Sequence, residues 1–281
     1  MQPADKTIPL IQLVLPWRIA AHLSEYATLI WQFTKRDVLS RYRGSYLGIF
    51  WSLLRPLALL AMYTVVFGFI FESKLGNQIN ETKLDFALAL FCGLILFEFF
   101  AECTVRAPML MLNNVNYVTK VVFPLEILPV MTVGAALTQL VISFVPLFIG
   151  QQIVHGLIPI TALYLPVVLL PLILYCLGIT WMVASFGVFI RDVNSILPVL
   201  LQIVMYASAI FYSISKVPVH LLPIVRSNPL ATVIDQARAV ILLGMPPVWS
   251  QYFWLLAAGI IVMIVGYTFF MRTKNAFADV L

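Results

Sequence analysis

The chain has 281 residues, of which 62% are hydrophobic and 10% are charged, and its mean hydropathy is +0.99. Soluble domains contain about 45–50% apolar and about 25% charged residues, so this composition excludes an ordinary soluble protein. The net charge of +5 therefore bears on orientation in a bilayer rather than on nucleic-acid binding.

The first predicted element is an amphipathic helix at the membrane surface. Apolar residues recur at helical spacing between Ile19 and Phe33, and polar residues such as His22 and Lys35 face elsewhere. Trp17 and Trp31 fit as interfacial anchors. We expect this helix to lie in the interface rather than to cross it.

Six apolar runs follow, each long enough or nearly long enough to cross about 30 Å of hydrocarbon as a helix. They are Leu47–Phe71, Phe86–Val105, Leu125–Ile149, Leu163–Ile190, Ile196–Tyr212 and Tyr252–Met271. A β-barrel would alternate apolar and polar residues, whereas these runs are apolar on all sides. The sequence predicts an all-α polytopic membrane protein with an N-terminal segment (1–46), a six-span domain (47–271) and a tail (272–281).

The distribution of Lys and Arg predicts the orientation. With six spans, the segments on the same face as the N-terminus carry most of these residues, and the opposite face carries fewer. The positive-inside tendency then places both termini in the cytoplasm.

The outer connection between the last two runs contains signals for a short helix. Asn228 is a good N-cap, Pro229 suits the first helical position, and an apolar stripe extends from Leu230 to Ile241 before Gly244 and Pro246. We expect this helix to dip into the outer leaflet as a re-entrant element.

A basic cluster lies where the interface helix turns into the first run. It contains Arg36, Arg41 and Arg43, and Arg55 follows further into the run. Arginine offers a fork of donors that can hold a phosphate, but basic residues here also anchor a protein on anionic lipid. A charge as deep as Arg55 usually faces protein or a cavity.

Two acidic residues stand out in the second run. Glu98, Glu102 and Arg106 follow at intervals of four residues and share one helix face. Such carboxylates can transfer protons, or they can form a salt-bridge ladder that ends at Arg106. The ladder is the interpretation that Arg106 favours.

Aromatic residues are concentrated in the first and fifth runs. Such rings can stack on sugars in a channel, although lipid-facing belts use the same residue types. The candidates for a channel lining are Trp51, Tyr63, Phe67, Phe71, Tyr206, Phe211 and Tyr212.

The sequence contains no Gly-Lys-Ser/Thr loop for ATP and no run of buried acids that would suggest a proton-driven carrier. Its three Cys and three His residues lack metal-ligand spacing, so we expect no metal site. If the protein pumps a substrate, a separate chain has to supply the energy, and we expect no cofactor in this chain.

Five short motifs in order give the chain a family resemblance. It resembles the membrane subunits of ABC-2-type polysaccharide exporters, the permeases for O-antigen, capsule and teichoic-acid polymers. The motifs are Arg36–Trp51 with Leu54–Pro56, Gly93–Leu94 with Phe97–Phe100, Asn113–Pro129, Phe189–Asp192, and Asn228–Leu230 with Ala237–Gly244. The chain departs from the usual pattern at Glu98 and Glu102, where less charge is expected.

The resemblance implies a homodimer of six-span subunits that works with two copies of an ABC ATPase, which binds the ATP and Mg. It implies export of a polysaccharide linked to polyprenyl pyrophosphate, with the first and fifth spans lining the channel. Contact with the ATPase would involve the interface helix and the link between spans two and three. The link residues concerned are Asn114, Asn116, Tyr117, Lys120 and Glu126. An outer gate would include Asn228, Pro229 and Arg238.

Two other functions are compatible with parts of the sequence. One is an ABC-2 exporter of a drug or another small amphiphile, but the basic cluster and the aromatic spans favour a polyanionic lipid-linked sugar. The other is a membrane-embedded glycosyl or phosphoglycosyl transferase that uses Glu98 and Glu102. That enzyme would need a sizeable polar loop or a metal-binding aspartate pair, and the sequence has neither.

Overall fold

The computed structural model describes residues 15–41, 46, 48–66, 83–119, 123–212, 217–220 and 222–280. Every regular element in these ranges is helical, and none is a strand. The α-helices are α2 (Pro16–Glu25), α3 (Ala27–Ser40), α4 (Trp51–Tyr63), α5 (Lys83–Arg106), α6 (Val115–Thr119), α7 (Ile127–His155), α8 (Leu165–Phe189), α9 (Val193–Ala207), α10 (Leu222–Ser227), α11 (Pro229–Ile241), α12 (Trp249–Thr273) and α13 (Phe277–Val280). Short 3₁₀ turns are η1 (Gly48–Phe50), η3 (Leu112–Asn114), η4 (Ile160–Tyr164) and η6 (Lys274–Ala276).

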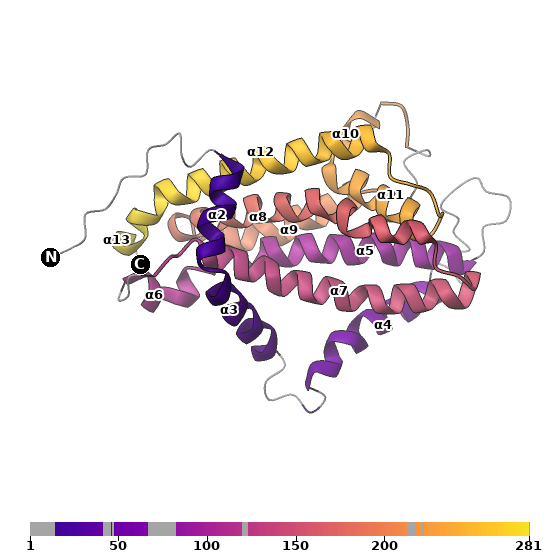
Figure 1. Ribbon diagram of the computed structural model, residues 1–281, viewed down its shortest axis with the longest axis horizontal. Helices are drawn as coiled ribbons and strands as arrows, with labels where there is room; N and C mark the ends of the chain where they lie inside the picture. Colours follow the sequence, from indigo (N-terminus) through magenta and orange to yellow (C-terminus); the bar gives the residue numbers. More distant parts are fainter. Residues whose placement is uncertain are drawn as a thin grey trace.

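Four helical segments of the described chain are long and apolar enough to cross a membrane. These segments contain α5, α7, α8 and α12, which run along the long axis of the molecule (Figure 1). Mean hydropathies of 1.9 to 2.3 over these segments, in a described chain whose regular elements are all helical, are typical of a polytopic membrane protein.

The predicted first run is described only in part, and the fifth is shorter as a helix than the sequence suggested. The first is described as Trp51–Val66, and the predicted remainder as far as Phe71 lies outside the described residues. The fifth, α9, ends at Ala207, so the prediction that it continues to Tyr212 is wrong. The chain turns there because Ala209 takes a left-handed backbone conformation, with φ of 52°, which cannot continue an α-helix.

The amphipathic segment forms two helices instead of the single predicted one. Tyr26, with φ of −103° and ψ of 14°, interrupts the helix between α2 and α3. The two helices make different contacts. Ile19 of α2 is buried in an apolar cluster, and Thr34 of α3 packs against Gly134 of α7. The bend lets both contacts form, and α2 crosses the long helices at an angle (Figure 1).

The centre of the fold is α5, whose apolar stretch is 78% buried. Its side chains from Phe86 to Cys103 form one core with residues of α7, α8 and α11. The three cysteines of the chain, Cys92, Cys103 and Cys176, are buried and unbridged, as expected for small apolar side chains. A helix buried on this scale fixes the position of every polar group that it carries.

The closest helix packing joins α8 and α12. A Cβ atom added to Gly266 would overlap the backbone of Gly178, and one added to Gly178 would overlap the backbone of Val262. A Cβ atom on Gly259 would lie 2.8 Å from the carbonyl oxygen of Pro171. The two helices therefore touch backbone to backbone, which is the packing that small residues permit in membranes.

Replacing Gly266 by Ala is expected to destabilise the protein by about 1–3 kcal/mol through overpacking. The direction of the stability change is informative. At an exposed position inside a helix, the same Gly-to-Ala replacement would stabilise the helix by about 1 kcal/mol. Gly150→Ala is the matched control, since its Cβ would meet only the end of the flexible Leu88 side chain. Thermal unfolding in detergent, followed by tryptophan fluorescence, measures both. Equal midpoints for the two variants would contradict the backbone contact.

Candidate functional site

A bidentate ion pair joins α3 to α5 at one end of the bundle. Arg106 donates from Nη1 to Oδ2 of Asp37 at 2.9 Å and from Nη2 to Oδ1 at 2.7 Å. Arg41 donates to Oδ2 of the same carboxylate at 3.1 Å. Burial opposes ionisation of Asp37, but the hydrogen bonds and charges of Arg106 and Arg41 outweigh it and hold its pKa below the ordinary value. Asp37 is therefore ionised and fixes both arginines.

The two glutamates of α5 face the same group of arginines. Glu102 is paired with Arg41 and lies 3.6 Å from Arg106, and Glu98 lies 3.9 Å from Arg55 of α4. The predicted ladder along α5 is thus confirmed between Glu102 and Arg106. It is wrong for Glu98, whose partner lies on a different helix.

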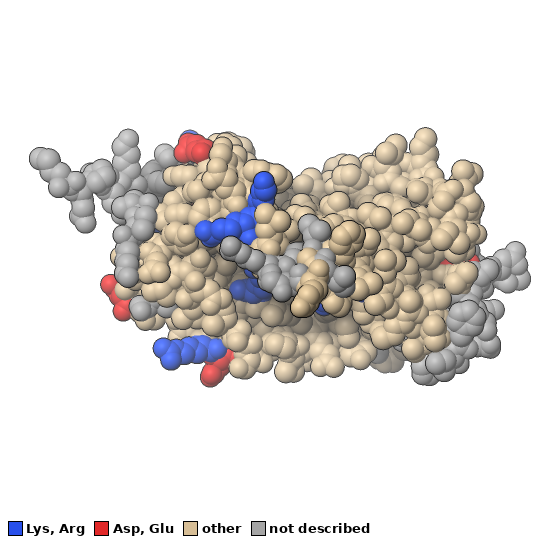
Figure 2. All heavy atoms as spheres, turned by 90° about the horizontal axis from the view of Figure 1, so that it is seen from below, with Lys and Arg blue, Asp and Glu red and all other residues tan. Residues whose placement is uncertain are grey.

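These charges line a cavity of about 610 Å³ between α3, α4, α5 and α7. Trp51 and Ser52 of α4 form one wall, and Gln139 of α7 donates to the backbone oxygen of Ser52 at 2.9 Å. The volume falls within the range of about 300–1,000 Å³ typical of small-molecule sites. Figure 2 shows this side of the molecule, where Lys and Arg gather over the half that carries α2 and α13 in Figure 1.

Of the predicted phosphate-binding arginines, Arg41 and Arg55 line this cavity. Arg36 lies outside it, over the ring of Phe33 at 4.3 Å, and Arg43 lies outside the described residues. The structure adds Arg106, which the sequence suggested only as the end of a ladder. Sequence reasoning missed Asp37, although its spacing of four residues before Arg41 is a signal for an ion pair.

An aromatic cluster connects α3 to the segment between α5 and α7. The rings of Tyr117 and Phe123 stack with centroids 4.7 Å apart, and Phe33 of α3 lies 5.7 Å from Tyr117. Arg36 donates to the Tyr117 hydroxyl at 3.4 Å. Helix α3 and the segment between α5 and α7 therefore form one surface.

The other residues of the link have different environments. Asn116 is exposed, whereas Asn114 donates to the backbone oxygen of Leu110 at 2.8 Å. Lys120 lies outside the described residues. Contact with a partner chain is therefore open to Asn116 and the edge of Tyr117.

Glu126 lies inside the protein and holds both ends of the described chain. It is 2% exposed, and its carboxylate lies 2.8 Å from Nε2 of His22 and 3.5 Å from Nζ of Lys274. Its backbone oxygen accepts a hydrogen bond from Trp181 at 3.0 Å. Glu126 joins α2, α7, α8 and η6 and has no surface to offer a partner directly.

The predicted channel aromatics fall into separate groups. Trp51 lines the cavity, and Tyr63 packs partly against the main core. Phe211 lies 5.7 Å from the ring of Tyr206, and the Tyr212 hydroxyl donates to the backbone oxygen of Tyr206 at 2.8 Å. Phe67 and Phe71 lie outside the described residues.

The short helix α11 begins and ends as predicted. The Asn228 side chain accepts from the backbone N–H of Leu230 at 3.0 Å, Pro229 is the first helical residue, and Gly244 has φ of 66° just past the end. Asn228 also donates to the Ser208 hydroxyl at 2.9 Å, which attaches the helix start to the end of α9.

Arg238 of α11 is 5% exposed and is bound by backbone carbonyls. It donates to Ala89 of α5 at 2.8 Å, to Ala209 at 3.0 Å and to Ile210 at 2.7 Å. Gly93 leaves room for it, because a Cβ there would lie 3.0 Å from the guanidinium. One buried side chain thus joins α11, α5 and the turn after α9.

Comparison with known proteins places this geometry in a family. The model of the ABC-2 type transporter family matches residues 28–242, which include the cavity and α11. The chain belongs to the ABC-2 type transporter family. It is 26% and 24% identical to two proteins of Klebsiella pneumoniae called O-antigen export system permease protein RfbA, over 88% of this chain and 93% of each relative. A Myxococcus xanthus protein with the same description is 24% identical over 93% of this chain and 98% of its own length.

The matches extend over most of this ABC-2 chain and of its relatives. The predicted resemblance to polysaccharide-export permeases is therefore confirmed at the level of the family and its O-antigen permease relatives.

Replacing Asp37 by Asn is expected to lower the free energy of unfolding by about 1–2 kcal/mol, after allowance for screening by solvent. The wild-type advantage is present above the ordinary carboxyl pKa of 3.8 and is lost as the pH falls through the lower pKa of the folded protein. Asp192→Asn at an exposed turn is the control. Unfolding midpoints at pH 7 and at pH near 3 measure the difference, and an equal effect at both would be inconsistent with an ionised Asp37.

Replacing Arg238 by Gln is expected to cost about 1.5–3 kcal/mol or more, because hydrogen bonds from a charged donor to buried carbonyls are lost. Arg191→Gln removes the same charge at an exposed turn and should leave stability nearly unchanged. Thermal unfolding in detergent compares them. A similar loss in both variants would show that net charge, and not the three carbonyl contacts, is responsible.

Proposed function

We propose that this chain is the membrane subunit of an ATP-driven exporter that moves a polysaccharide linked to polyprenyl pyrophosphate, such as an O-antigen, across the cytoplasmic (inner) membrane. The cavity is the observation that carries the proposal. Its arginines Arg41, Arg55 and Arg106 lie at the end of the bundle where the interface helix meets α4 and α5. Guanidinium groups offer the planar fork of donors that suits a pyrophosphate group.

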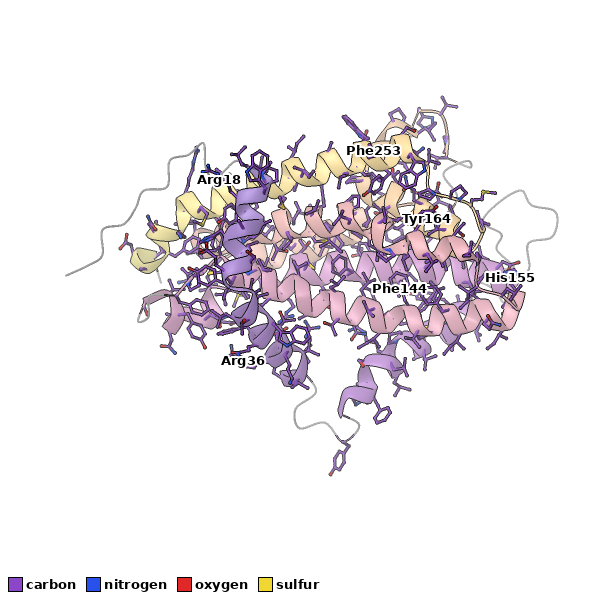
Figure 3. The ribbon with its side chains drawn as sticks, in the orientation of Figure 1. Arg18, Arg36, Phe144, His155, Tyr164 and Phe253 are labelled. Atoms are coloured by element: carbon purple, nitrogen blue, oxygen red, sulfur yellow. The ribbon has the colours of Figure 1, made fainter. Side chains whose placement is uncertain are left out.

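The proposed topology has six spans, with α4 and α9 as parts of the first and fifth. Residues 1–46 then form a cytoplasmic segment, residues 47–271 the transmembrane domain and residues 272–281 a cytoplasmic tail. The fold supports this arrangement, because α2, α6 and α13 gather at one end of the bundle, where α2 crosses the long helices (Figure 1). The opposite end, which holds His155 at the end of α7 (Figure 3), would be the outer side. There α11, with Asn228, Pro229 and Arg238, would serve as a re-entrant outer gate.

The proposed energy source is a separate ABC ATPase that binds the ATP and Mg, with two copies on a homodimer of this chain. This chain would bind no cofactor itself. The surface made by α3 and α6 supports the docking of an ATPase, because Asn116 is exposed beside the stacked Tyr117. Movement of this surface would reach α7 through the buried Glu126 and its partners His22 and Lys274. The described aromatics of α4 and the turn after α9 would face the sugar chain.

Replacing both Arg41 and Arg55 by Lys is expected to lower polymer export at least severalfold, because Lys cannot make a planar two-bond contact with phosphate. Anchoring on anionic lipid alone would tolerate Lys, which keeps the charge. Arg18→Lys, at an exposed position of α2, is the control. The measurement is surface polymer in cells that express the chain with its ATPase, at matched membrane abundance. Full export by the double Lys variant would remove the recognition role.

A further inference from the structure

The charged cluster at the cavity, which consists of the lining residues and the adjacent Asp37, contains as many acidic as basic side chains. This balance is unusual for a site that has to attract an anion. Arg41, Arg55 and Arg106 face Asp37, Glu98 and Glu102. In this arrangement Arg41 and Arg106 are already paired with carboxylates, and Arg55 has Glu98 beside it at 3.9 Å. An anionic headgroup can bind strongly only after some of these carboxylates have been displaced from the guanidinium groups.

The three carboxylates are held differently. Asp37 makes two aligned hydrogen bonds with Arg106 at 2.7 and 2.9 Å, and this contact also fixes α3 on α5. Glu98 makes no comparable bond with Arg55, because their closest atoms are 3.9 Å apart and the Arg55 side chain is 75% exposed. The Asp37 contact is structural, whereas the Glu98 contact costs little to break.

Glu102 can leave its arginine partners for a different reason. Its partner Arg41 also donates to Asp37 at 3.1 Å, and its second neighbour Arg106 is held by the same Asp37. Both arginines therefore keep a partner and their positions when Glu102 withdraws. Glu98 and Glu102 lie one turn apart on a single face of the central helix α5 and can act together.

We propose that Glu98 and Glu102 act as internal substitutes for the phosphates of the lipid carrier. In the unloaded protein Glu102 pairs with Arg41 and Glu98 lies beside Arg55, and the incoming pyrophosphate takes their place. This inference rests on the proposed function and adds a competitor within the site. In the empty cavity, the two carboxylates balance the charge of the arginines. They also compete with the bound pyrophosphate and so weaken its binding, which allows the carrier to leave.

Neutralising the two carboxylates is expected to strengthen the binding of a prenyl pyrophosphate. The experiment measures the binding of farnesyl pyrophosphate, inorganic pyrophosphate and farnesol to the purified full-length chain in lipid nanodiscs. The variant Glu98→Gln/Glu102→Gln should bind farnesyl pyrophosphate about 10-fold more tightly than wild type, because two like charges are removed near the anion. Inorganic pyrophosphate should show a gain in the same direction, and farnesol should show none.

Two matched variants identify the source of the gain. Glu25→Gln, on the exposed end of α2, makes the same chemical change away from the cavity and should leave affinity unchanged. Adding Arg55→Gln to the double Gln variant should abolish most of the gain. Glu98→Gln alone, which loses only the 3.9 Å contact, should show a smaller gain and serves if the double variant does not fold.

Different outcomes separate this inference from the proposed function. If wild type prefers farnesyl pyrophosphate to farnesol but the Gln variants bind it no more tightly, the inference is overturned and the proposed function stands. A gain that farnesol or the Glu25→Gln variant shares also overturns the inference. If no form of the protein prefers the pyrophosphate to farnesol, both the inference and the proposed carrier site fail.

Discussion

A charge within an apolar helix bundle is stable only when another polar group meets it, and this constraint organises the fold. Asp37 reaches from α3 to Arg106 and so fixes the interface helix on the central helix α5. Arg238 is held by three carbonyls and so fixes α11 on the same helix. Glu126 holds α2 and η6 against the start of α7. Each of these polar contacts joins elements that apolar packing alone would leave free to slide.

The two anchoring arginines of α5 and α11 differ in a way that suits different tasks. Arg238 binds backbone oxygens, which cannot rotate away, so its contacts persist for as long as the local fold does. Arg106 and its neighbour Arg41 also contact Glu102, whose carboxylate lies on a flexible side chain. A contact with a backbone oxygen lasts as long as the local fold, whereas a contact with a side-chain carboxylate can be replaced by another partner. The end of the bundle with the cavity is therefore the end equipped to respond to an ion.

The sequence predicted the features that depend on local pattern. The apolar runs located the long helices, and Asn228 and Pro229 located the start of α11 to the residue, because capping and hydropathy act over a few residues. It could not predict that Glu98 pairs with Arg55, since that contact depends on how α4 packs beside α5. The bend at Tyr26 and the end of α9 were missed for the same reason. Tertiary contacts decide them.

The backbone contact between α8 and α12 limits how the protein can move. Side chains at an ordinary helix interface can change rotamers and let the helices shift, but Gly178 and Gly266 have no side chains that could adjust. The two helices will therefore move as one rigid body. In the proposed exporter, a passage for a long polymer would then have to widen by displacement of helices other than this pair. Motion of α4 relative to this rigid pair is accordingly the simplest degree of freedom for opening.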